Sequence, residues 1–375
     1  MDTKKIISGY KKQGARIETA PRVKLRTKQD IALWYTPGVG VASSHLAKNP
    51  KEARQMSVKK NSVAVVSDGS AVLGLGNIGP YGALPVMEGK ALLFKQLAGI
   101  DAWPIVLDTQ DADEIVRVVK AIAPAFGGIN LEDIAAPKCF EVEKALGELG
   151  IPVMHDDQHG TAIVVLAGLI NAAKVAKKTL GKLRVVISGA GAAGIATAKL
   201  LSAAGVKDIV LLDRSGIIAP SRENLSPVKQ ELLSFANPRM LEGGLDEAMN
   251  GADAFIGLSG KGVLTAAHVE RMAENAIVFA LANPEPEIYP EEAKKAGALV
   301  VATGRSDFPN QINNSLVFPG VFRGALDRGV TAITEASKLR AAKALAALVP
   351  KPTAAKIIPD SLDKKVVPAV ARAIR

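Results

Sequence analysis

The segment from residue 184 to residue 213 constrains the fold more than any other part of the chain. Its apolar run RVVIS (184–188) leads into GAGAAG (189–194), which has the glycine spacing G-x-G-x-x-G. The helix-forming run IATAKLLSAAG (195–205) follows, and a second apolar run, DIVLLD (208–213), ends at Asp213. This order predicts a strand, a tight glycine turn, a helix and a second parallel strand. The pattern is typical of a Rossmann-type dinucleotide-binding unit.

The glycine turn and the acid that follows it supply the parts that a dinucleotide needs. Glycines let the backbone approach a pyrophosphate closely, and the free N–H groups at the start of the helix bind it. Asp213 is expected to accept hydrogen bonds from the adenosine ribose, which favours NAD, whereas the neighbouring Arg214 could receive the 2′-phosphate of NADP. The choice between NAD and NADP therefore stays open. The residues assigned to the phosphate turn are Gly189, Gly191, Ala192, Ala193 and Gly194.

A second match to the same spacing, GLGNIG (74–79), shows how little the glycines say alone. Pro80 and Pro85 follow it, so we expect no long helix to begin there, and no acid ends a second strand at the required distance. We therefore interpret GLGNIG as a tight turn that supports the segment after it, and not as a second dinucleotide site.

Apolar runs alternate with helical patterns along the rest of the chain. We expect two strands around the turn at 67–69, a helix that ends at Gly99, a buried strand WPIVLD (103–108) and a long helix over 159–178. The later runs DAFIGLS, AIVFALA and ALVVAT alternate with helices, as in a parallel sheet. The sequence thus predicts an α/β fold with an N-terminal α/β substrate domain (1–158), a Rossmann-type domain with a parallel sheet (159–330), and a C-terminal segment (331–375) that packs back on the first domain.

Composition excludes several classes of protein. The single cysteine, Cys139, allows no internal disulfide, and the N-terminus lacks an apolar core of signal-peptide length. The sequence contains no run of about 20 apolar residues, which is the length that a membrane-spanning helix needs. The net charge of +10 suggests binding to nucleic acid, but the lysines are scattered and lack interleaved aromatic residues for base stacking. We expect a cytoplasmic protein without membrane or nucleic-acid partners, whose basic surface attracts an anionic substrate.

Two pairs of adjacent acids stand beside apolar segments, Glu132-Asp133 and Asp156-Asp157. Helix capping explains one acid in each pair but not two, because adjacent carboxylates repel unless a cation or a proton lies between them. A set of oxygen ligands suits Mg²⁺ or Mn²⁺. His155 and His159 also suggest zinc, but no cysteine stands beside them to complete a zinc site.

Lys90 lies on the apolar face of its predicted helix, near Met87 and Phe94 at helical spacing. Such a lysine either extends its amine to water or holds it in a dry pocket, where the pKa of the amine falls. The acidic pairs favour the second interpretation.

Taken together, several long blocks resemble the malic enzymes, in particular those of the short prokaryotic type. The resemblance runs from about residue 30 to residue 330 and returns in the C-terminal block IIPDSLDKKVVPAVA. It implies oxidative decarboxylation of L-malate to pyruvate and CO₂ with NAD⁺ or NADP⁺ and Mg²⁺ or Mn²⁺, and also decarboxylation of oxaloacetate. The blocks are WYTPGVG (34–40), SDGSAVLGLGNIGPYGALPVMEGKALLFKQLAGIDAWPIVLDT (67–109), EDIAAPKCFEVEKAL (132–146), HDDQHGTAIVVLAGLINA (155–172), ISGAGAAGIA (187–196) and SDFPNQINNSLVFPGVFRGALD (306–327).

The resemblance also implies roles for single residues. Lys90 matches the general base and Tyr35 the general acid, and Asp156 is a candidate for proton relay. Where large members of the family have an arginine for the substrate carboxylate, this chain has Ser70-Ala71, so other groups must hold it. The implied metal ligands are Glu132, Asp133 and Asp157, and the residues implied near the nicotinamide and the malate carboxylate are Asn283 and Asn313.

The implied chemistry requires a base at the 2-hydroxyl, and we expect Lys90 to serve as a neutral amine in an apolar setting. The resemblance further implies a homodimer or a larger homo-oligomer, in which the segment with Tyr35 can be exchanged between subunits. Three alternatives stay open: a malolactic-type lyase that retains its cofactor and releases lactate, an amino-acid dehydrogenase, and a silent nucleotide-binding regulator. The last two have no use for the acidic pairs.

Overall fold

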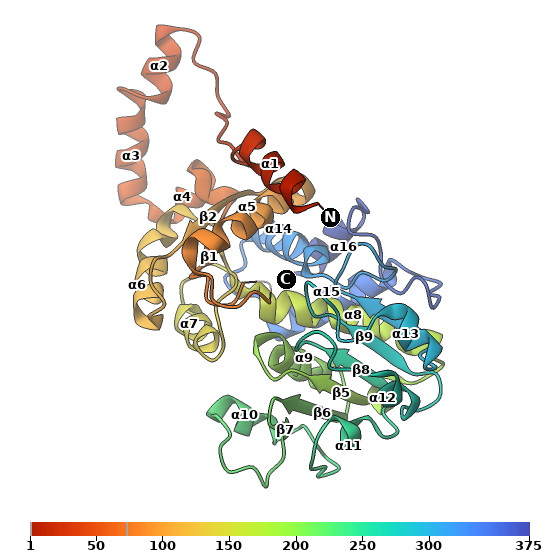
Figure 1. Cartoon of the computed structure of the whole chain (residues 1–375). Coiled ribbons are helices and arrows are strands. Elements are labelled where there is room, and N and C mark those ends of the chain that lie inside the picture. Colours follow the sequence, from red (N-terminus) through yellow and green to blue (C-terminus); the bar gives the residue numbers. More distant parts are fainter. Residues whose placement is uncertain (1, 73) are drawn as a thin grey trace.

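The first of two sheets is formed by four short strands from the N-terminal part of the chain (Figure 1). The computed structural model describes residues 2–72 and 74–375. All four strands are parallel, and β1 lies in the interior of the sheet with every residue buried. In sheet order they are β2 (Asp101–Val106), β1 (Ser62–Ser67), β3 (Gly128–Leu131) and β4 (Val153–His155).

Two local predictions for this sheet are wrong. Strand β2 is an edge strand and not a buried one: Trp103 is 41% exposed, and the edge position tolerates Pro104, which cannot donate a ladder hydrogen bond. No second strand follows the turn after β1 in the described residues, where only a bridge joins Val72 to Gly76; Leu73 lies outside them. The Asp68 carboxylate instead accepts hydrogen bonds from the N–H and hydroxyl of Ser70, and this local turn competes with strand pairing.

Helix α5 (Gly79–Ala98) begins at the last glycine of GLGNIG, contrary to the expectation that the prolines exclude a long helix. Pro80 occupies the first turn, where a helix needs no N–H donor, and Pro85 is accommodated inside the helix. The helix ends at Gly99 in the left-handed conformation, as predicted.

The second sheet contains the predicted Rossmann-type unit. The first five strands in its order are parallel, as predicted, and the short edge strand β7 pairs antiparallel with β6. Helix α9 (Ala192–Ala203) follows β5, as predicted. The order is β10 (Val300–Thr303), β9 (Ile277–Ala280), β8 (Ala254–Gly257), β5 (Arg184–Ser188), β6 (Asp208–Asp213) and β7 (Gly216–Ile217).

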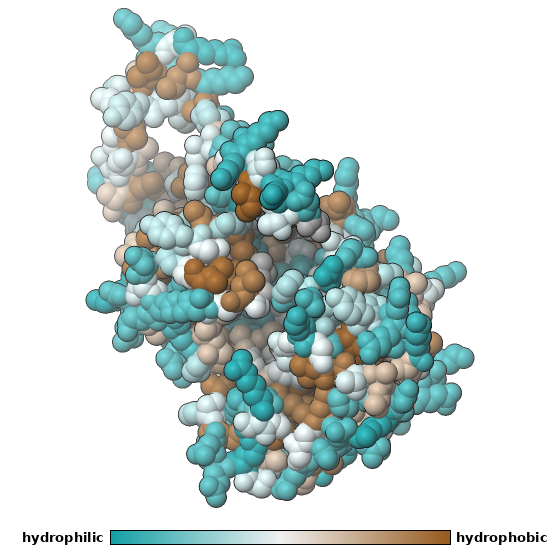
Figure 2. Space-filling view, in the orientation of Figure 1, coloured by the Kyte–Doolittle hydropathy of each residue, from teal (hydrophilic) through white to brown (hydrophobic). Residues whose placement is uncertain are grey.

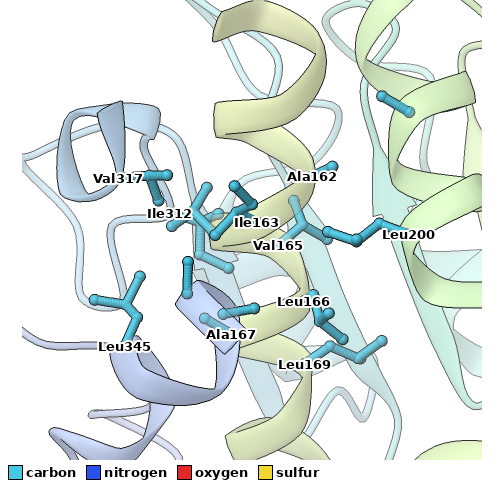
Figure 3. Packing of buried hydrophobic residues seen from close by; sticks show 14 of the residues in the cluster. Ala162, Ile163, Val165, Leu166, Ala167, Leu169, Leu200, Ile312, Val317 and Leu345 are labelled. Carbon is cyan, nitrogen blue, oxygen red and sulfur yellow. The ribbon is translucent and has the colours of Figure 1, made fainter. Parts of the chain in front are cut away.

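Helix α8 (Asp156–Val175) is the shared centre of the molecule, and most of its residues are buried. Figure 3 shows its apolar side chains directed toward Leu200 of α9 on one side and toward Ile312, Val317 and Leu345 on the other. A helix that is apolar on all sides is stable only inside such a core. Residue 158 therefore lies in the first turn of α8 and not in a linker, and the division of the chain at residues 158 and 330 stays a prediction.

The C-terminal helices pack on this core. Helix α14 (Phe318–Arg328) packs on α5, where the rings of Phe318 and Phe322 lie 4.7 Å and 5.5 Å from the ring of Phe94. Helix α15 (Glu335–Ala347) packs on α8, and α16 (Val366–Ala373) packs on α14. The final segment thus covers α8 and α14.

Helices α2 (Lys28–Trp34) and α3 (Gly38–Lys48) form an arm that projects from the body (Figure 1). Neither helix has a buried residue, and apolar side chains are visible on the surface of the arm in Figure 2. The exposed large apolar residues here are Ile31, Leu33, Trp34, Tyr35, Val39 and Val41. No helix in the described part of the chain is long and apolar enough to cross a membrane. Other helices are α1 (Thr3–Gln13), α4 (Ala53–Met56), α6 (Ala112–Ile122), α7 (Lys138–Leu146), α10 (Pro227–Leu232), α11 (Leu245–Met249), α12 (Ala266–Glu270) and α13 (Pro290–Lys295).

Candidate functional site

The two acidic pairs meet at the carboxyl edge of the first sheet. Glu132-Asp133 follows β3, and Asp156-Asp157 follows the neighbouring strand β4 as the first residues of α8. Parallel strands end at a common edge, which is where open α/β sheets place their ligands. The topology therefore converts two separate sequence motifs into one cluster.

Three of these carboxylates are arranged so that they could hold a metal ion. One oxygen from each of Glu132, Asp133 and Asp157 lies within 4.8 Å of the others. The N–H of Asp133, whose φ is 54°, donates to Asp157 Oδ2 over 2.8 Å. Within the described residues, no cysteine or histidine joins this set. An all-oxygen donor set fits Mg²⁺ or Mn²⁺ and does not favour zinc.

Lys90 projects from α5 into the same cluster. Its Nζ lies 2.5 Å from Asp156 Oδ2, 2.9 Å from Glu132 Oε1 and 4.5 Å from the centre of the Phe318 ring. The side chain is 11% exposed, so the expected burial is correct. The charges around the amine act against the expected neutral form. Burial alone would lower the pKa of Lys90, but the charges of Asp156, Glu132 and Asp157 raise it above its usual value.

The cluster contains more acid than Lys90 can neutralise. Burial raises the pKa of Glu132 well above its usual value and that of Asp156 to about 6, although Lys90 opposes both shifts. The amine of Lys90 pairs with two of the four carboxylates, and Oδ1 of the fully buried Asp156 has no hydrogen-bond partner. A divalent cation would supply the missing positive charge, so the donor set and the electrostatics both fit a metal ion.

Tyr35 does not share this site within one chain. It ends α2 on the projecting arm and is 67% exposed. The amine and the carboxylates thus converge as expected, whereas the phenol lies apart from them. The physical reason is that no core residue anchors the arm to the body.

The GAGAAG turn has the geometry of a phosphate cradle. A side chain at Gly189 would collide with the carbonyl of Leu258, and one at Gly194 would collide with the carbonyl of Gly189. Gly191 faces open space, where a pyrophosphate could approach the first turn of α9, which starts with Ala192 and Ala193. The site lies between the parallel strands β5 and β8, where the order of the strands in the sheet reverses.

Asp213 is more constrained than the sequence suggested. Its carboxylate accepts hydrogen bonds from Arg222 Nη1 at 2.9 Å and from Lys229 Nζ at 2.6 Å, as well as from the N–H of Ser215. Burial would raise the pKa of Asp213, but these partners lower it to about 2. The expected neighbour Arg214 is exposed. Arg222 and Lys229 could not be predicted as partners of Asp213, because they lie in a loop after β7 and in the short helix α10, and no motif links them to Asp213.

The two asparagines lie in loops that follow strands of the second sheet. Asn283 follows β9, and its side-chain amide donates to the carbonyl of Leu281. Gly74 of the GLGNIG turn lies against the backbone carbonyl of Asn283, where any side chain would collide. The second glycine motif therefore forms a contact between the two halves. Asn313 precedes a short turn that packs on α8, and its side chain accepts a hydrogen bond from the N–H of Ser315.

Models of protein families match both halves of the chain. The model of the malic enzyme N-terminal domain matches residues 14–147, and that of the malic enzyme NAD-binding domain matches residues 158–374.

Individual proteins with known names match over almost the whole chain. The NAD-dependent malic enzyme of Geobacillus stearothermophilus is 54% identical over 364 residues, which cover 96% of this chain and 76% of that protein. The bifunctional malic/malolactic enzyme of Bacillus subtilis is 52% identical over 369 residues, covering 97% and 90%. Among solved structures, the NAD-dependent malic enzyme of Thermotoga maritima matches with a TM-score of 0.95 at 46% identity, covering 100% of this chain and 98% of that chain.

Proposed function

Because this chain belongs to the malic enzyme family, we propose that it oxidises L-malate with NAD⁺ or NADP⁺ and releases pyruvate and CO₂. The hydride from C2 reduces the nicotinamide, the 2-hydroxyl proton goes to the enzyme, the C3–C4 bond breaks to give CO₂, and C3 receives a proton. Decarboxylation of added oxaloacetate uses the later steps alone. The observation that carries the proposal is the ion pair of Lys90 with Glu132, whose carboxylate lies in one cluster with those of Asp133 and Asp157.

Lys90 is the proposed base for the 2-hydroxyl of malate. When bound by Glu132, Asp133 and Asp157, Mg²⁺ or Mn²⁺ supplies an electron sink for decarboxylation and offsets the acid charge that keeps Lys90 protonated. Asp156 stays hydrogen-bonded to Nζ of Lys90 and is positioned to take up its proton. The raised pKa of Asp156 suits this relay, because a carboxylate with an ordinary pKa would hold a proton too weakly near neutral pH.

Tyr35 is the proposed acid that protonates C3, and it reaches the site of a second copy of the chain. The arm formed by α2 and α3 leaves apolar side chains exposed, including Leu33 and Trp34. A homodimer would cover them and would place Tyr35 beside a partner subunit. The exposed arm supports this assembly because a large unpaired apolar surface is unusual on a protein that stays monomeric.

The substrate carboxylate has to be held without an arginine at Ser70-Ala71. The hydroxyl of Ser70 donates to Asp68 and accepts from the N–H of Ala135, so it is already engaged. We assign the carboxylate to the amides of Asn283 and Asn313 together with the metal ion.

Both cofactors are compatible with the residues around Asp213. A free carboxylate would repel a 2′-phosphate, but Arg222 and Lys229 already bind this one and leave a net positive charge. The names of the relatives include both NAD-dependent and NADP-dependent malic enzymes.

A malolactic reaction is the second candidate, because one relative with 52% identity is named a bifunctional malic/malolactic enzyme. In that reaction the reduced cofactor would be consumed again and lactate would form.

The cytoplasmic location stays a prediction.

The decisive assay supplies malate, Mn²⁺ and either NAD⁺ or NADP⁺ and follows reduced nicotinamide, pyruvate and lactate. Steady formation of reduced cofactor and pyruvate in equal amounts supports the proposal, whereas lactate without net reduction supports the malolactic alternative. Lys90→Ala should abolish turnover while cofactor binding is retained. Near-normal activity of that variant would refute the role of Lys90, and Lys95→Ala, an exposed lysine of the same helix, is the matched control.

A further inference from the structure

Three ionisable side chains from α7, α8 and α15 form a hydrogen-bond network. Nε2 of His159, on the first turns of α8, lies 2.9 Å from Oε2 of Glu143 on α7. Nδ1 of the same ring lies 2.9 Å from Nζ of Lys338 on α15. The side chains of Glu143 and His159 are about four-fifths buried, at 20% and 19% exposure. The proposed reaction uses none of the three.

The donor and the acceptor in each of these two hydrogen bonds can be assigned in only one way. A lysine ammonium only donates, so Nδ1 of His159 accepts and Nε2 carries the hydrogen that is donated to Glu143. A carboxylate only accepts, so the contact with Glu143 agrees with this assignment. Burial would raise the pKa of Glu143, but His159 and the N–H of His155 lower it to about 2, so its carboxylate is ionised.

The second oxygen of Glu143 connects the three hydrogen-bonded side chains to the acidic cluster. Oε1 accepts the backbone N–H of His155 over 2.8 Å. His155 is the last residue of β4 and precedes the first residues of α8, which are Asp156 and Asp157. Helix α7, which carries Glu143, begins shortly after Glu132 and Asp133. Glu143 therefore joins the two segments that carry the predicted metal ligands without touching the ligands themselves.

We propose that Glu143 and Lys338 are positioning residues that fix the first turn of α8 and thereby set the affinity of the Glu132–Asp133–Asp157 cluster for its divalent ion. The inference rests on the proposed function, because it assumes that this cluster binds the metal. It assigns a role to the C-terminal segment: α15 supplies Lys338, which selects the histidine tautomer that Glu143 needs.

Glu143→Gln is the primary test, since it keeps the size of the side chain and reverses one hydrogen bond. If the new amide oxygen still accepts from His155, its NH₂ group faces Nε2 of His159, which must then accept. The ring hydrogen moves to Nδ1 and confronts the ammonium of Lys338, so two donors meet. We expect the dissociation constant for Mn²⁺, measured from the electron paramagnetic resonance signal of free Mn²⁺, to rise about tenfold, as is typical when a group behind the metal ligands is changed.

Removal of the lysine then gives a readout that a general loss of structure would not produce. Lys338→Met alone should raise the dissociation constant by a smaller factor, because the ring loses one partner without a clash of donors. Added to Glu143→Gln, it should restore part of the Mn²⁺ affinity, since the conflict with the ammonium disappears. Contacting residues that act as one unit are expected to be non-additive in this way. Glu141→Gln on α7 and Lys343→Met on α15 are exposed controls that should leave binding unchanged.

The outcomes separate this proposal from the proposed function. Wild-type protein that binds no Mn²⁺ overturns both. Wild-type protein that binds Mn²⁺, together with unchanged affinity in Glu143→Gln or a double variant that is weaker than either single one, overturns the positioning role alone. Thermal unfolding is recorded for every variant. Should Glu143→Gln fail to fold, Lys338→Met remains the test, and unchanged Mn²⁺ affinity in that folded variant overturns the proposal.

Discussion

The backbone N–H of Asp133 donates a hydrogen bond to Oδ2 of Asp157 over 2.8 Å, although the two residues are 24 positions apart in the chain. This bond joins the end of β3 to the start of α8 and brings the two acidic pairs together. Both residues belong to the three-carboxylate cluster that is proposed to hold the metal. The bond also directs one oxygen of Asp157 toward the backbone, so the geometry of the cluster depends on the sheet edge.

Asp157→Ala should raise the Mn²⁺ concentration needed for half-maximal activity by on the order of tenfold or more, because one of three carboxylate ligands is lost. Initial rates over a Mn²⁺ series at saturating malate and cofactor measure the change. Asp113→Ala, which removes an exposed acid from the equivalent first turn of α6, is the control. An unchanged metal requirement in Asp157→Ala would exclude that residue as a ligand.

Mixing two inactive variants should restore activity if Tyr35 acts in the partner's site. Tyr35→Phe and Lys90→Ala are each expected to lose activity by about 100-fold or more. After the subunits exchange at random, one site in about four contains both native residues, so about a quarter of wild-type activity should return. Lys90→Ala mixed with Asp157→Ala should recover nothing, because those two residues serve the same subunit's site. Equal recovery in both mixtures, or none in either, contradicts the exchange.

Lys229→Ala should weaken the use of NADP⁺ more than that of NAD⁺. The ammonium that now binds Asp213 is available to a 2′-phosphate, and the loss of one charge-assisted hydrogen bond corresponds to about tenfold in KM. The measurement is KM for both cofactors with malate and Mn²⁺ held constant. Lys199→Ala, whose amine pairs with Glu231, is the control. A change of equal size for both cofactors would show that Lys229 has no role in the choice.

Cys139 should resist alkylation in the folded protein at pH 8. Burial, with the charges of Asp157 and Glu143, raises the pKa of its thiol to about 12, so the fraction of reactive thiolate at pH 8 is about 10³-fold below that of a free cysteine. The rate should rise with pH toward 12, because only the deprotonated form reacts. Mass spectrometry after treatment with iodoacetamide follows the reaction, and unfolded protein is the control. Rapid labelling of the folded protein would contradict the prediction and would mean that the structure around Cys139 opens to solvent.

Local sequence determined the parts of this protein whose physics is local. The run from RVVIS to Asp213 formed the predicted strand, turn, helix and strand, because glycine spacing and apolar periodicity act within a single βαβ unit. The acidic pairs predicted a cation site, since adjacent carboxylates are unfavourable without a positive charge, and the structure brings Glu132, Asp133 and Asp157 together. The long apolar helix predicted over residues 159–178 corresponds to α8, which begins and ends three residues earlier.

Only the tertiary structure decided which distant groups became partners. Lys90 was expected in an apolar setting, but the sheet edge places Glu132 and Asp156 at its amine and raises its pKa. Asp213 pairs with Arg222 of a loop and with Lys229 of the short helix α10, and no local pattern links these two residues to Asp213. Periodicity assigns a residue to a face of its own helix or strand. The charges around Lys90 and Asp213, and the edge position of β2, depend on neighbours that only the assembled sheets bring into contact.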